Sequence, residues 1–111
     1  MHIINLTPHA INFVGEDGKV FLSVPSSGVA RAAATRSKVG EIQANGGIIP
    51  INTTTFGEVR DLPEPQPDTI YVVSALTAQA APERSDLYIT DDAVRDDAGR
   101  IIGCRALARP V

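Results

Sequence analysis

The segment Ile70–Ser74, with the sequence IYVVS, is the most continuous run of β-forming residues in the chain. Unbroken apolar runs are typical of strands that are covered on both faces, whereas half-exposed strands alternate apolar and polar residues. We therefore expect a central, buried strand here. The alanine-rich segment Ala75–Ala81 follows at once and stops before Pro82, which predicts one or two turns of helix.

A hairpin is predicted near the start of the chain. The apolar-rich segments Ala10–Val14 and Lys19–Val24 flank the turn signal Gly15–Gly18. The next segment, Val29–Arg36, is helical by its alanine content or a strand by its position. We favour a strand, because no good capping box precedes it and β segments lie on both sides.

The remaining pattern is one of short strands and turns. Further predicted strands are His2–Leu6, Val39–Gln43, Ile48–Asn52, Asp86–Thr90 and Arg100–Ala108, with turns at Ala44–Gly47 and Asp97–Gly99 and a bulge at Gly103. The pattern predicts a single α+β domain over residues 1–111. It is mostly β, with a mixed or antiparallel sheet and one short helix after the strand at residues 70–74; a small barrel-like sheet is the alternative.

Composition and charge exclude several classes of protein. Hydrophobic residues make up 43% of the chain and charged residues 21%, so we expect a folded protein. A net charge of -3 argues against general binding of nucleic acids, which requires a basic face. Cys104 is the only cysteine, so no internal disulfide can form. With no signal-peptide pattern and no apolar run near ~20 residues, we expect a cytoplasmic protein without a membrane partner.

Arginines and carboxylates cluster near the ends of the predicted strands in the last third of the chain. The planar guanidinium group matches phosphate and carboxylate oxygens in a forked geometry. The expected ligand-binding residues of this kind are Arg84, Arg95 and Arg105 as clamps, with Asp86 and Asp96 orienting an arginine or accepting ribose hydroxyl groups. The alternative is structural ion pairing, which contributes only about 0–1 kcal/mol at a surface.

Polar residues at a bend and at a strand end complete the candidate site. Asn5, Thr7 and His9 surround the proline-fixed bend at Pro8, where their side chains either converge on a ligand or satisfy the local backbone. Ser74 and Thr77 lie where the central strand passes into the helix, a position that often holds sites.

Catalysis and metal binding have weaker support. Histidine is a common general base, but His9 has no identifiable partner. Cys104 in a terminal strand more readily packs inward than acts as a nucleophile beside Arg105. We therefore predict no catalytic residues. His2, His9 and Cys104 lack the spacing of zinc ligands, and the pairs Asp91–Asp92 and Asp96–Asp97 are typical of solvated turns. No metal or cofactor is predicted.

Four segments carry a resemblance to a known family. They are Asn5–His9 (NLTPH), Thr69–Ser74 (TIYVVS), Val94–Asp96 (VRD) and Gly99–Arg105 (GRIIGCR). With them the chain resembles a family of small proteins of bacteriophages, prophages and actinobacterial genomes over nearly its whole length. In size and setting only, it is also similar to phage proteins that counter host immunity by sequestering cyclic or ADP-ribose-derived nucleotide signals. This likeness implies a binding role in the host cytoplasm, often as an oligomer, and carries over no binding residues.

The sequence thus favours a non-enzymatic protein that binds a small anionic ligand. A phage-encoded sponge for a nucleotide immune signal, either a cyclic dinucleotide or an ADP-ribose derivative, is the specific expectation, and we expect a homo-oligomer because the core of so short a chain is thin. One alternative is a small hydrolase or transferase that acts on a nucleotide through His9 or Cys104. Another is a structural phage protein whose apolar strands mediate contacts between copies.

Overall fold

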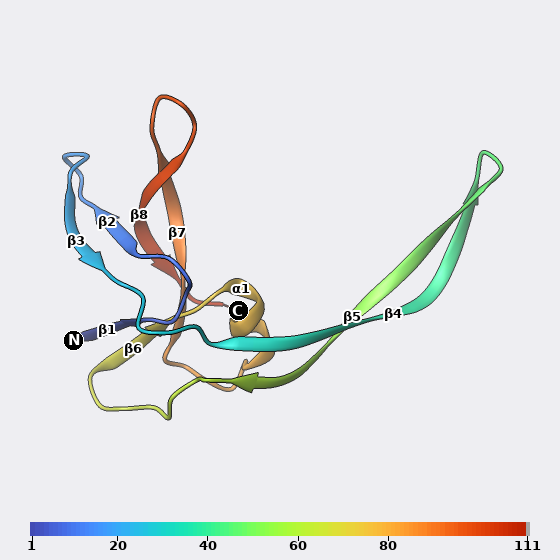
Figure 1. Ribbon diagram of the computed structural model, residues 1–111, viewed down its shortest axis with the longest axis horizontal. Coiled ribbons are helices and arrows are strands. Elements are labelled where there is room, and N and C mark those ends of the chain that lie inside the picture. Colours follow the sequence, from blue (N-terminus) through green and yellow to red (C-terminus); the bar gives the residue numbers. More distant parts are fainter. Residues whose placement is uncertain (111) are drawn as a thin grey trace.

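The computed structural model describes residues 1–110 and has two parts, a curled sheet and a long projecting hairpin (Figure 1). In this range six strands form a mixed sheet in the order β1-β6-β7-β8-β2-β3, and the pair β4–β5 is separate. The strands of the sheet are β1 (His2–Asn5), β2 (Ile11–Val14), β3 (Val20–Val24), β6 (Thr69–Val72), β7 (Leu87–Arg95) and β8 (Ile101–Ala108). The hairpin consists of β4 (Arg31–Ala44) and β5 (Gly47–Arg60), and the helix is α1 (Ala75–Ala80).

The predicted character of the fold is confirmed: it is mostly β, with a mixed sheet and one short helix after the strand at residues 70–74. Strand β6 lies between β1 and β7 and is parallel to both. Tyr71, Val72 and Val73 are almost fully buried, as expected for a strand that is covered on both faces. Strands dominate the chain more than the term α+β conveys.

Two apolar clusters pack against the sheet. Tyr71 and Val73 belong to one cluster, which contains residues of α1 and the base of the hairpin. Val72 belongs to the other, with Phe13 and Cys104. Because neighbouring residues of a strand point to opposite faces, β6 contributes to both clusters and joins them.

The sheet curls until its two edges meet. Asn5 in β1 forms a bridge with Ser26, just beyond the end of β3, and the Ser27 backbone N–H donates to the Asn5 carbonyl at 2.8 Å. The predicted hairpin β2–β3 is present and supplies one of these edges. The arrangement therefore has features of the barrel-like alternative.

The projecting hairpin β4–β5, hereafter the arm, is much longer than the short strands expected from the sequence. Each of its strands has 14 residues, joined by the two-residue turn at Asn45 and Gly46. Both turn residues have positive φ, 50° and 80°, which the Asn-Gly pair tolerates and which confirms the predicted turn. The strand expected at Val29–Arg36 is confirmed, but it continues through a bulge at Val39 instead of ending.

The short helix α1 is held by two hydrogen bonds of Thr77, one to its N-cap and one to the base of the arm. The Thr77 backbone N–H donates to the Ser74 hydroxyl at 3.2 Å, which satisfies one of the free N–H groups of the first turn. The buried Thr77 hydroxyl donates to the Ala30 carbonyl at 3.1 Å and so ties the helix to the base of the arm. Among residues 1–110, no helix is long and apolar enough to cross a membrane.

Strand β7 is also longer than expected, whereas β8 agrees with the predicted strand at Arg100–Ala108 to within one residue. Strand β7 continues past Thr90 to Arg95, and the predicted turn at Asp97–Gly99 then leads into β8. Val94 pairs with Gly103 and Arg95 pairs with Ile101, so the register of the β7–β8 pairing shifts between these two pairs. This irregularity lies next to Gly103, where the sequence predicted a bulge. Strand β8 also pairs with β2 in parallel, which brings the two ends of the chain together in one sheet.

Candidate functional site

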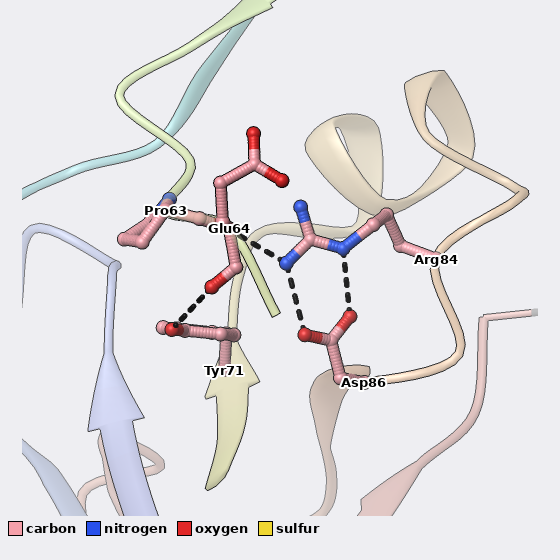
Figure 2. Close-up of polar contacts among 5 residues, drawn as sticks. All are labelled: Pro63, Glu64, Tyr71, Arg84 and Asp86. Atoms are coloured by element: carbon pink, nitrogen blue, oxygen red, sulfur yellow. Dashed lines mark hydrogen bonds and ion pairs between the residues drawn. The ribbon is translucent and has the colours of Figure 1, made fainter. Parts of the chain in front are cut away.

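Arg84 is bound within the protein instead of facing a cavity (Figure 2). Its guanidinium group forms a two-point ion pair with Asp86, at 2.9 Å for each contact, and donates to the Pro63 carbonyl at 2.9 Å. The same group lies 5.9 Å from the centroid of the Tyr71 ring, and the Tyr71 hydroxyl donates to the Glu64 carbonyl at 3.1 Å. These contacts hold the proline-rich connector between β5 and β6, Pro63–Pro67, against the sheet.

The electrostatics of this cluster fit a structural ion pair. The hydrogen bond to Asp86 raises the pKa of Arg84, and burial opposes this effect. The hydrogen bond from Arg84 likewise lowers the pKa of Asp86. Only 15% and 16% of the two side chains is exposed, so the pair is well shielded from water. Arg84 therefore has little freedom to clamp a phosphate.

The other predicted arginines also contact the chain locally. Arg95 donates to the Gly99 carbonyl at 2.8 Å, and Arg105 donates to the Gly15 carbonyl at 3.2 Å. Asp96 accepts from the backbone N–H groups of Ala98 and Arg100 and so caps its own turn. The three arginines thus stabilise three separate turns, and the structure does not gather them around one cavity.

Asn5 and Thr7 organise the bend at Pro8. The fully buried Asn5 amide donates to the carbonyls of His9 and Val24, and its oxygen accepts from the Thr7 N–H at 2.9 Å and the Thr7 hydroxyl at 2.6 Å. Each polar atom of the Asn5 side chain has a partner. The sequence analysis offered two roles for the side chains at this bend, binding of a ligand or hydrogen bonding to the local backbone. The contacts of Asn5 and Thr7 fit the second role.

An open groove of about 760 Å³ lies over the sheet where the β1–β2 loop, β2, β7 and β8 meet. Its lining residues are Thr7, His9, Ala10, Ile11, Asn12, Val73, Ser74, Ala75, Ile89, Thr90, Asp91, Asp92, Ala93, Ile101, Ile102, Gly103 and Cys104. The volume falls within the range of roughly 300–1,000 Å³ that is usual for ligand sites. This groove is the candidate functional site.

Three of the ten predicted site residues line this groove: Thr7, His9 and Ser74. Thr77 is a buried residue of α1, and Asn5, at the end of β1, is buried beside the bend. The sequence prediction missed Asp91 and Asp92 as site residues, although both line the groove. Asp is rare in strands, yet these two adjacent aspartates lie within β7. A pair of carboxylates inside an otherwise β-forming segment is the sequence signal that could have identified them.

The charge of the groove is acidic. Asp91 and Asp92 are exposed at its edge, and neither an arginine nor a lysine is among its lining residues. Asp92 has a φ of 55°, a left-handed conformation that aspartate tolerates better than most residues. The anionic ligand expected from the arginines therefore has no cationic group in this groove to bind it.

The enzyme alternative from the sequence relies on Cys104 as nucleophile or His9 as base, and the described residues activate neither of them. Cys104 is 4% exposed, and burial raises the pKa of its thiol, assisted by the nearby charges of Asp91 and Asp92. Its inward packing is as the sequence analysis expected. His9 is exposed, and no side-chain hydrogen bond to its ring occurs within residues 1–110.

Metal ligands are not grouped anywhere in the described residues. No three His, Cys, Asp or Glu side chains between residues 1 and 110 lie close enough to hold a metal ion.

Comparisons with protein-family models, with curated proteins and with solved structures found no match to this chain. The groove and the arm are therefore the two features of the molecule that point to a function.

Proposed function

We propose that this protein is a non-catalytic, self-associating protein whose β4–β5 arm contacts other copies of the chain. The observation that carries the proposal is the uncharged face of the arm. Cross-strand partners share a face, so Ile42 and Ile49 lie together, and Ile51 lies two residues farther along the same face. These side chains are 52%, 54% and 40% exposed.

The charges of the distal arm lie on its opposite face. The pairs Glu41–Pro50, Lys38–Asn52 and Arg36–Thr54 alternate with the uncharged pairs Gly40–Ile51, Ser37–Thr53 and Thr35–Thr55. A two-stranded hairpin in water is marginally stable unless its apolar face is covered. Three of the four isoleucines of the distal arm share the uncharged face, whereas Ile48 lies on the other face. An exposed, uncharged apolar face of this kind is typical of a surface that is buried in an assembly.

The resemblance to phage and prophage proteins gives this role a setting. We propose a structural part in a phage assembly, in which the arm links neighbouring copies. This is the structural alternative from the sequence, and the arm supports it better than the arginines support a phosphate clamp.

Light scattering of Ile49→Thr and Ile48→Thr tests the proposal. Threonine preserves β propensity, and the two positions are adjacent and similarly exposed, at 54% and 59%, but lie on opposite faces. We expect the wild type to be oligomeric and Ile49→Thr to raise the dissociation constant about tenfold. Ile48→Thr is the matched control and should change it little. A wild-type protein that stays monomeric at all concentrations contradicts the proposal.

A second candidate function is binding of a small molecule in the groove. The groove volume and its polar edge, with His9, Ser74 and Asp91, favour this candidate. The two carboxylates favour a ligand that has hydroxyl or amine donors, and the nucleotide expected from the sequence stays a prediction. Calorimetric titration with cyclic dinucleotides and ADP-ribose isomers tests it, and an absence of heat across that panel removes the nucleotide ligand.

A further inference from the structure

The arm cannot pack against its own sheet. Figure 1 shows its tip far from β2, β7 and β8, and the longest dimension of the molecule is 54 Å. The Cα radius of gyration is 17.6 Å, whereas a compact chain of this length has a radius of about 13 Å. Whatever covers the isoleucine face must therefore come from outside the chain.

The arm and the remainder of the chain have opposite net charges. Residues 31–60 contain four basic and two acidic side chains, for a net charge of +2. The other residues contain six basic and eleven acidic side chains, for a net charge of -5, and the two values account for the total of -3. A positively charged arm is thus attracted to the body of a second copy.

The groove matches the arm in both polarity and charge. Its apolar lining includes Ile11, Ile89 and Cys104, and its carboxylates are Asp91 and Asp92. The distal arm carries Ile42, Ile49 and Ile51 on one face. Its other face carries Ile48 and two basic side chains, Arg36 and Lys38, of which Lys38 forms an ion pair with Glu41. Long basic side chains can extend past the edge of a ribbon toward carboxylates while apolar groups occupy the groove.

The area of the arm favours reciprocal exchange. The base of the arm packs against its own core, so only about ten residues of each strand, 35–44 and 47–56, are free. At ~3.3 Å per residue and ~4.8 Å per strand, one face of this distal part measures about 33 by 10 Å, or about 330 Å². A stable interface buries about 800 Å² per partner. One arm alone supplies too little, whereas two arms that are exchanged in a two-fold dimer supply about 660 Å² per partner. Their total of about 1,320 Å² lies at the lower end of the range of roughly 1,200–2,000 Å² for specific interfaces.

We propose that the Ile42, Ile49 and Ile51 face of each arm lies in the Asp91–Asp92 groove of a second copy of this chain, and that the two copies exchange arms reciprocally. This inference rests on the proposed function, because it names the surface that receives the arm. It also assigns the groove to a protein segment in place of a small ligand.

Photo-crosslinking tests where the arm binds. Benzoylphenylalanine is placed at position 49 or, as the matched control, at position 48, and a mixture of ¹⁵N-labelled and unlabelled protein identifies crosslinks between copies. We expect position 49 to crosslink to residues 89–93 or 101–104 of the other copy, with at least a fivefold lower yield from position 48. The doubly substituted Asp91→Lys/Asp92→Lys protein should lower the yield from position 49 by a similar factor.

The outcomes separate this inference from the proposed function. An oligomer whose arm crosslinks to β3, to another arm or to no groove residue overturns the arm-in-groove contact but leaves self-association intact. A monomer by light scattering overturns both.

Discussion

At the scale of single residues, the polar side chains that the sequence suggested for ligand binding satisfy one another. Asn5 donates to the His9 carbonyl and stabilises the bend at Pro8, and Arg84 donates to the Pro63 carbonyl and stabilises the connector. Within residues 1–110 no buried side-chain nitrogen or oxygen lacks a hydrogen-bond partner. These groups stabilise the fold because burial without a partner costs about 1–3 kcal/mol for each group.

Substitution of Asp86 should show this role. Asp86→Asn leaves the largely buried Arg84 without its counter-charge, so we expect a loss of about 1–3 kcal/mol in the free energy of unfolding at pH 7. The lowered pKa of Asp86 means that the unfolded chain binds the proton first. The wild-type contribution is therefore present above pH ~4 and is lost as the pH falls through the lower folded pKa.

Urea unfolding between neutral and acidic pH measures this effect. The difference in stability between wild type and Asp86→Asn should shrink as the pH falls below ~4. A difference that is constant with pH would show that the ion pair contributes nothing.

At the scale of elements, the contact between β2 and β8 depends on a glycine. A Cβ atom at Gly103 would lie 2.7 Å from the Asn12 carbonyl oxygen and 2.9 Å from a methyl carbon of Val14. Both distances are too short, and the first involves backbone that cannot rotate away. The parallel pairing of Phe13 with Cys104 therefore requires a residue without a side chain next to Cys104.

Gly103→Ala should destabilise the protein by about 1–3 kcal/mol, because β2 must shift to admit the methyl group. Gly40→Ala is the matched control. It is also a strand glycine, but its Cβ would meet only a methyl group of Ile51 at 3.9 Å, so we expect a change below about 0.5 kcal/mol. Urea unfolding at equal protein concentration compares the two. Equal effects would mean that β2 and β8 are not held as closely as described.

At the scale of the whole molecule, the separation of charge between arm and body predicts that assembly depends on salt. The Debye length is about 10 Å at 0.1 M salt and about 3 Å at 1 M, so attraction between arm and body is screened as salt rises. We expect the dissociation constant of the wild-type oligomer to rise about tenfold over this range, as measured by light scattering. A constant or falling value would indicate that apolar contact alone drives association.

The local elements were largely predictable from the sequence, because their signals are local. The buried strand at Ile70–Ser74, the hairpin around Gly15–Gly18, the turn at Asn45 and Gly46 and the helix after Ser74 all follow from residue patterns within a few positions. The arm was read as separate short strands since a bulge at Val39 interrupts the alternation while the pairing continues.

What the sequence alone determined is therefore the type of each element and the acidic balance of the chain. The tertiary structure decided which residues meet: it directed Arg84, Arg95 and Arg105 to backbone carbonyls in three separate loops and brought Asp91 and Asp92 to a groove with His9. The reason is physical. Turn and propensity signals act over a few residues, whereas the parallel pairing of β2 with β8 joins residues about 90 positions apart.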